Sequence, residues 1–238
     1  MWSRRDFLQF ASISSALLVG QPLKALAAKQ NIRFEDLLQF KNKGQVTLLH
    51  FTDIHGQLKP VYYRPPSENY GVGLFEGVPP HLVGESFLSH FGIKPSTPMA
   101  YAHTMVDYVR LALEYGKLGG LDRMATVIKA IRAERGDDKV LLLDGGDTWQ
   151  GSFTSLKTQG MDMVKTISLL KPEAMVGHWE FTLGKSRLEE LIKQMSCPFL
   201  GGNVFDTEWE EQVFESTSFI EKGGINIAVI GQHFPYTP

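Results

Sequence analysis

The apolar positions of the chain follow two alternating patterns from residue 45 onward. Short and nearly continuous apolar runs, which are typical of buried strands, occur at 45–52, 139–143, 174–176 and 198–204. Between them, apolar residues recur at helical spacing in the segments 119–135, 161–170 and 186–195. Two further strands are expected on either side of a turn at Gly223 and Gly224, at 214–220 and 225–230. This alternation predicts an α/β domain with helices packed outside a sheet.

The segment from about 58 to 116 does not fit this alternation. It is rich in proline, glycine and aromatic residues, as in Tyr62-Tyr63-Arg64-Pro65-Pro66. Loops of this length inside a compact domain are usually functional. Two interpretations therefore remain, a functional insertion and a solvated surface excursion without a function.

The first residues of the chain have the pattern of an export signal. Ser3 to Gln9 (S-R-R-D-F-L-Q) matches the twin-arginine pattern, and a mild apolar run follows at 10–20. That run is shorter than the roughly 20 residues of a membrane-spanning helix. Ala25-Leu26-Ala27 offers a cleavage site with small residues. We therefore predict a twin-arginine signal peptide at 1–28 and a periplasmic protein without membrane insertion after signal removal; the alternative is a disordered or amphipathic N-terminal segment.

Composition narrows the class of protein only slightly. The 238 residues suffice for one sizeable domain with a full hydrophobic core. A net charge of −2 gives no reason to expect a nucleic acid or an anionic membrane as partner. We expect a monomeric soluble enzyme or binding protein.

We do not expect Cys197, His50 or His233 to be catalytic residues. Cys197 is the only cysteine, so an internal disulfide is excluded, and a lone thiol entering a strand is typical of a core residue. His50, inside the first strand, is expected in the core or behind the ligands. His233 follows the last strand and is not assigned to a metal.

Candidate metal ligands follow the predicted strands. Asp53 and His55 come after the first strand, Asp147 after the second and His178 after the third. Open α/β sheets place their sites at the carboxyl ends of strands, so we expect these side chains to converge, with Asp147 able to bridge two metals. Mixed carboxylate and imidazole ligation suits Mn²⁺, Fe or Zn²⁺. The alternative is an aspartate that caps a helix, accompanied by core histidines.

Three motifs in order carry a family resemblance. They are D-I-H-G at 53–56, D-G-G-D at 144–147 and G-H-W-E-F-T at 177–182. The set resembles the calcineurin-like metallophosphoesterases, specifically their 5′-nucleotidase branch. The resemblance implies a four-layer α/β/β/α sandwich and a centre of two Mn²⁺ ions, with Zn²⁺ or Fe as alternatives. It also places Arg123 near a phosphate site, where a surface salt bridge is the competing interpretation.

The third motif departs from the nucleotidase pattern G-N-H-E-F-D. Here His178, Trp179 and Thr182 replace its Asn, His and final Asp. This replacement resembles the SoxB family of thiosulfohydrolases, which implies a thiosulfonate on a cysteine of a SoxYZ-type carrier as substrate and sulfate as product. Trp179 would then line the site with its N–H toward the substrate, because an indole cannot shuttle a proton. The alternative is that Trp179 only fills space.

The resemblance covers 45–238, and the family continues beyond that point with further histidine ligands and a second domain. We therefore expect an N-terminal part of a metallophosphoesterase domain that is incomplete at its C-terminus and inactive alone if those ligands are required. Two other functions compete with the thiosulfohydrolase. One is a periplasmic 5′-nucleotidase-like phosphohydrolase, and the other is a non-catalytic fragment that binds the carrier.

Overall fold

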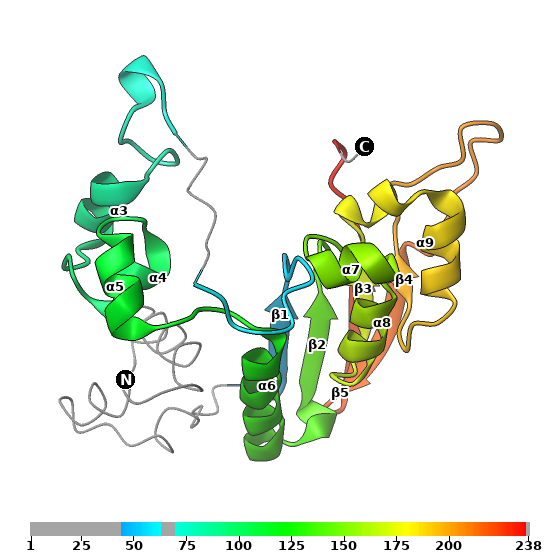
Figure 1. The fold of residues 1–238 in the computed structure, drawn as a ribbon. Coiled ribbons are helices and arrows are strands. Elements are labelled where there is room, and N and C mark those ends of the chain that lie inside the picture. Colours follow the sequence, from blue (N-terminus) through cyan, green and yellow to red (C-terminus); the bar gives the residue numbers. More distant parts are fainter. Residues whose placement is uncertain (1–43, 63–69, 237–238) are drawn as a thin grey trace. The chain divides into compact units, whose positions relative to one another are not determined.

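The computed structural model describes residues 44–62 and 70–236 of the chain (Figure 1). These residues form two compact units. The insertion unit comprises 59–62 and 70–127, and the sheet unit comprises 44–58 and 128–236. The predicted signal peptide at 1–28 lies outside the described residues.

The sheet unit is built on a four-stranded parallel sheet in the order β1-β2-β3-β4. Its strands are β1 (Thr47–Phe51), β2 (Val140–Asp144), β3 (Ala174–Val176) and β4 (Phe199–Leu200). Phe51 pairs with Asp144, and Asp144 pairs with Met175, so the ends of β1, β2 and β3 lie next to one another. The predicted α/β class is confirmed, although β4 is much shorter than the predicted strand.

Most helices of the sheet unit bury one apolar face. The helices of this unit are α7 (Phe153–Thr158), α8 (Met161–Ser168), α9 (Lys185–Ile192) and residues 128–135 of α6 (Leu121–Arg135), with short 3₁₀ turns η3 (Asp137–Lys139) and η4 (Trp179–Leu183). In α8, Met163, Val164 and Ile167 are buried at helical spacing. The core combines such residues with the central strands, namely Val140, Leu141, Leu142, Met175, Leu188, Leu191 and Leu200.

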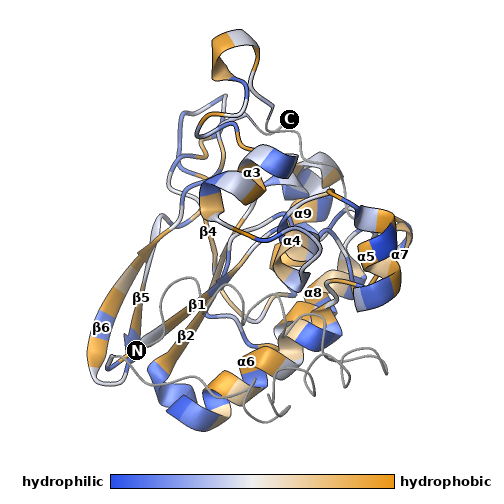
Figure 2. Cartoon of the chain, turned by 90° about the vertical axis from the view of Figure 1, so that its left-hand side faces the viewer, coloured by the Kyte–Doolittle hydropathy of each residue, from blue (hydrophilic) through white to orange (hydrophobic). Residues whose placement is uncertain are grey.

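A second, two-stranded antiparallel sheet joins β5 (Thr217–Lys222) to β6 (Ile225–Ile230). Gly223 and Gly224 both have positive φ, as a tight turn between strands requires. Figures 1 and 2 show α6 and α8 on one side of β1 and β2, and β5 and β6 on the other. The sheet unit therefore contains three of the four expected layers, in the order α/β/β.

The first strand is not buried as predicted. Only Phe51 of β1 is buried, and Leu48 is 63% exposed. In the described part of the chain, β1 is the edge strand, so alternate side chains lack a covering layer. His50 is one of these exposed residues, and its placement in the core was wrong.

The insertion unit is folded and mostly helical. It contains η2 (Gly73–Phe75), α3 (Gly84–Phe91), α4 (Pro98–His103) and α5 (Tyr108–Tyr115), of which the sequence predicted none. Tyr101, Leu111, Ala112 and Tyr115 form its core. A plain solvated excursion is therefore excluded, and a function for this segment stays a prediction. None of the helices in the described segments is long and apolar enough to cross a membrane.

Candidate metal centre

Two loops at the carboxyl ends of β1 and β2 run side by side. The backbone N–H of Asp53 donates to the carbonyl of Gly146 at 2.9 Å, and that of His55 donates to the carbonyl of Asp147 at 3.0 Å. Gly56 continues this pattern by donating to the Thr148 carbonyl. The pairing of the strands thus extends past their ends, which holds the first two motifs in fixed register.

The backbone at three candidate ligands is left-handed. Asp53, His55 and Asp147 have φ values of 56°, 48° and 56°. This region is disfavoured for residues with a Cβ, and such strain persists only where the surrounding structure imposes it. The conformation supports a functional role for all three positions.

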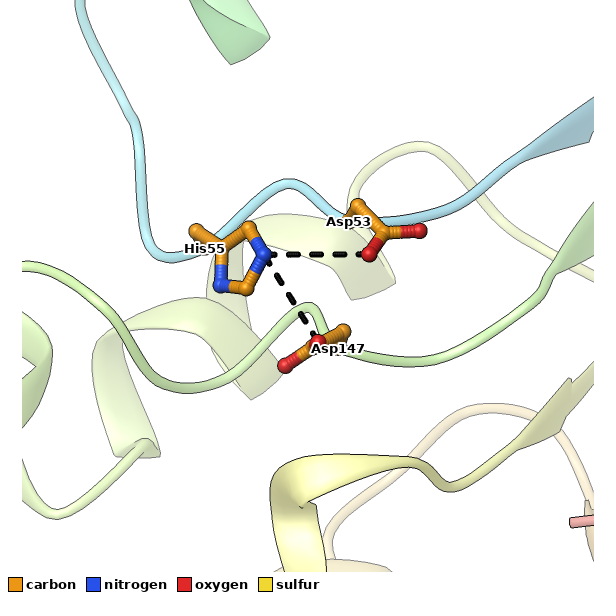
Figure 3. Close-up of side chains that lie close together, drawn as sticks. All are labelled: Asp53, His55 and Asp147. Atoms are coloured by element: carbon orange, nitrogen blue, oxygen red, sulfur yellow. Dashed lines mark ion pairs between the residues drawn. The ribbon is translucent and has the colours of Figure 1, made fainter. Parts of the chain in front are cut away.

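The side chains of these three residues meet at one point (Figure 3). Nε2 of His55 lies 3.7 Å from Oδ1 of Asp53 and 3.6 Å from Oδ2 of Asp147. Two donors on one ion, each about 2.1 Å away, are at most about 4.2 Å apart. The two separations from His55 therefore fit a shared divalent cation, and all three donor atoms lie within 4.8 Å of one another. Carboxylate with imidazole is a suitable donor set for such an ion.

His178 approaches the cluster from the end of β3. Its Nδ1 lies 2.8 Å from Oδ2 of Asp147, the same oxygen that faces His55. Gln150 donates to the other oxygen, Oδ1, at 2.6 Å. Asp147 is thus held between two imidazoles, as a bridging ligand would be. It caps no described helix, so the helix-cap alternative fails, while the role of the four residues as ligands stays a prediction.

Glu180 is a component of the site that the sequence analysis missed. It is fully buried, and its carboxylate accepts hydrogen bonds from the backbone N–H groups of Asp147, Thr148, Trp149 and His178. The only signal in the sequence was an acidic residue inside the third motif. Three of its partners, Asp147, Thr148 and Trp149, lie about 30 residues upstream in a different loop, so the sequence alone does not identify them.

His233 contacts the residue that precedes His178. Its Nδ1 lies 2.9 Å from the N–H of Gly177, and the ring packs against Phe181, Phe199 and Phe214. Burial lowers the pKa of the imidazole, so the neutral form is favoured. These contacts agree with the expectation that His233 does not ligate a metal.

The remaining predicted residues differ in their surroundings. The indole of Trp179 is 43% exposed, with its ring centre 6.4 Å from that of His178. The Thr182 hydroxyl donates to the Trp179 carbonyl, so it stabilises the 3₁₀ turn.

Arg123 belongs to the insertion unit, where it is buried and donates to the Lys117 carbonyl. Arg123 therefore does not lie at the surface, and its catalytic role stays a prediction.

Cys197 has the properties of a core thiol. Burial raises its pKa to about 12, with smaller contributions from Asp144 and Glu173. The thiolate is therefore scarce near neutral pH, which excludes an activated nucleophile.

Asp144 makes metal-free protein sensitive to pH. Its Oδ1 accepts from Gly146 and Thr148, whereas Oδ2 is buried without a partner among the described residues, and burial raises the pKa to about 7. A folded pKa above the unfolded value of 3.8 means that stability is lost as pH rises through 7. On going from pH 5 to pH 8, the unsubstituted chain should lose about 2–3 kcal/mol of unfolding free energy through Asp144. The Asp144→Asn variant should not show this loss. Urea denaturation at both pH values, with a chelator present, measures it; equal pH dependence in both proteins contradicts the prediction.

Gly146 is expected to tolerate no side chain. It has φ of +89°, and a Cβ there would lie 2.8 Å from the Val176 carbonyl oxygen and 3.0 Å from the His178 nitrogen. Gly146→Ala should therefore lower the unfolding free energy by more than about 1 kcal/mol. Gly224→Ala provides a control, because its φ is also positive and nothing lies within 4 Å of its added Cβ. Equal losses in the two variants would show that strain alone, and not loop contact, makes Gly146 necessary.

Several known proteins are similar to this chain in sequence or in fold. The solved structure of sulfate thiohydrolase SoxB from Thermus thermophilus superposes with a TM-score of 0.76 at 36% identity, covering 84% of this chain and 37% of that one. The human 5′-nucleotidase is 34% identical over 89 residues, which are 37% of this chain and 15% of the enzyme. A 5′-nucleotidase precursor from Thermus thermophilus shares the fold, with a TM-score of 0.52 at 21% identity over 80% of this chain and 29% of that one.

No family profile matches the sequence. The chain spans well under half the length of each of these relatives. The parallel sheet, the order of the three motifs and these similarities nevertheless agree. These similarities support the calcineurin-like metallophosphoesterase superfamily of metal-dependent hydrolases, which includes the 5′-nucleotidases, as the group that this chain resembles in sequence and fold.

Proposed function

We propose that the protein is a metal-dependent thiosulfohydrolase of the SoxB type. The observation that carries the metal centre is the single oxygen of Asp147 that faces both His55 and His178. The similarity to SoxB, together with Trp179 and Thr182 in the third motif, supports the substrate class. The substrate is a thiosulfonate carried on a cysteine of a SoxYZ-type carrier protein.

The four candidate ligands would hold two manganese ions, with Zn²⁺ or Fe as alternatives. Asp53 and His55 would hold one ion and His178 the other, with Asp147 available to both. When bound, such a pair supplies Lewis acidity, activation of water and charge compensation for a tetrahedral anion. Thr52 donates to Asp53 at 2.6 Å and Gln150 donates to Asp147, so both carboxylates are oriented before any ion binds.

Trp179 is better suited to a reaction with a persulfide leaving group than to one with an alkoxide leaving group. In the reaction, a water oxygen forms a bond to the sulfonate sulfur. The bond between that sulfur and its neighbouring sulfur breaks, and the neighbouring sulfur keeps the electron pair. Sulfate leaves and the carrier cysteine retains a persulfide. That leaving group needs less protonation than an alkoxide, so an indole, which donates one N–H but shuttles no proton, is sufficient.

The competing function is a 5′-nucleotidase-like phosphohydrolase, which the local similarity to the human 5′-nucleotidase favours. The deciding experiment supplies the full-length protein with Mn²⁺ and compares phosphate release from AMP with sulfate release from the thiosulfonate-loaded carrier. We expect sulfate release and little phosphate. Fast AMP turnover with an inert carrier would contradict the proposal, and carrier binding without sulfate release would indicate a non-catalytic binding module.

Export to the periplasm is part of the same proposal. The twin-arginine pattern at 1–28 supports it, because that pathway carries folded proteins that have already taken up their metal. N-terminal sequencing of protein from the periplasmic fraction should begin after Ala27 or Ala28. An intact N-terminus in the cytoplasmic fraction would contradict export.

A further inference from the structure

Glu180 joins the two loops that carry Asp147 and His178. Its Oε2 accepts from the N–H groups of Asp147 at 3.0 Å and His178 at 2.8 Å. Its Oε1 accepts from Thr148 at 2.6 Å and Trp149 at 3.0 Å. We propose that Glu180 is a positioning residue which, through these four amides, sets the separation of Asp147 and His178 and thereby the metal affinity; this rests on the proposed function.

The backbone at both ligands needs external support. Asp147 has a left-handed φ of 56°, and His178 has φ −136° and ψ −98°, outside the helical and extended regions. Neither residue lies within a helix or a strand. One carboxylate oxygen shared between their two N–H groups keeps both residues at a fixed distance. Strained backbone at a ligand persists only when surrounding contacts impose it.

Other contacts hold each loop separately, so that loss of Glu180 should loosen the centre without unfolding the chain. Gly177 is bound by His233, whose backbone N–H donates to Asn203. Asp147 accepts the N–H of His55 through its carbonyl. Only Glu180, among the contacts described here, connects the backbone of His178 to that of Asp147.

Two substitutions change the carboxylate in different ways. Glu180→Gln keeps the volume but leaves one acceptor oxygen, so one pair of N–H groups faces an amide nitrogen that cannot accept. Glu180→Asp keeps both acceptors but withdraws them by one methylene group. Glu173→Gln is the matched control. Glu173 also accepts a backbone N–H, that of Leu142 at 2.7 Å. It lies directly before β3, whereas the candidate ligand His178 follows the other end of that strand.

The test measures Mn²⁺ affinity by equilibrium dialysis and amide hydrogen exchange in the metal-free chain. We expect Glu180→Gln and Glu180→Asp to lower the affinity by about 10-fold or more, as losses of residues behind metal ligands typically do. Exchange at Asp147, Thr148, Trp149 and His178 should accelerate in both variants. Glu173→Gln should change neither quantity, even if it lowers the denaturation midpoint.

Unchanged affinity in the folded Glu180 variants would overturn the positioning role and leave the metal centre intact. An equal loss of affinity in Glu173→Gln would also overturn it, because the effect would then follow general destabilisation. Absence of Mn²⁺ binding by the unsubstituted chain would instead contradict the metal centre, and with it the role of Glu180. If Glu180→Gln does not fold, Glu180→Asp, which retains the carboxylate, decides the outcome.

Discussion

Asp147→Ala is expected to lower Mn²⁺ affinity more than any other single substitution in the chain. One oxygen of this carboxylate faces His55 at 3.6 Å and His178 at 2.8 Å, so its removal takes a ligand from both halves of the centre. Residues that only support ligands typically account for 10–100-fold in affinity, so we expect a loss of at least about 100-fold. Equilibrium dialysis with Mn²⁺, on protein whose folding is checked by circular dichroism, measures it.

Asp162→Ala is the control for this prediction. Asp162 lies in α8 and its carboxylate accepts from the Thr158 hydroxyl, away from the cluster. It should retain the affinity of the unsubstituted chain. A smaller loss in Asp147→Ala than in Asp53→Ala or His55→Ala would show that Asp147 is not shared between two ions.

Trp179→His combined with Thr182→Asp is expected to change which bond the enzyme breaks. The pair would restore the histidine and aspartate of the nucleotidase motif, and both positions lie in the accessible turn η4. Loss of one oriented donor typically costs about 10²–10³ in rate, so sulfate release should fall by that order. Phosphate release from a nucleotide should rise, because a general acid then serves the alkoxide leaving group.

The two single variants separate the contributions of these residues. Thr182→Asp alone removes the hydroxyl that donates to the Trp179 carbonyl and should have a small effect. Trp179→His alone should lower sulfate release without a comparable gain in phosphate release. Unchanged sulfate release in the double variant would show that Trp179 is only a space-filling residue beside the ligands.

Most regular elements of the sheet unit were predictable because they left a pattern of apolar residues in the sequence. β2 and β3 are buried apolar runs, and α6 and α8 have apolar residues at helical spacing. α7 left no such pattern, since it has six residues and exposes Phe153 and Leu156. The exposure of Leu48 in β1 depends on which strands and helices cover it, and an apolar run alone does not show that.

Some features of the candidate metal centre were also predictable from the sequence, and others were not. Asp53, His55 and Asp147 were predictable because polar residues directly after parallel strands collect at one edge of the sheet. The left-handed backbone at these residues was not predictable, since a positive φ is uncommon for any residue with a Cβ. Glu180 was missed because its four partners become neighbours only when two loops meet.

Anomalous diffraction at the manganese edge, from crystals of this chain grown with Mn²⁺, tests whether Asp147 is a shared metal ligand. We expect manganese within roughly 2.0–2.2 Å of the Asp147 carboxylate, with His55 and Asp53 on one side and His178 on the other. No manganese near Asp147 at saturating concentration, or ions bound only at other acidic groups, would contradict it.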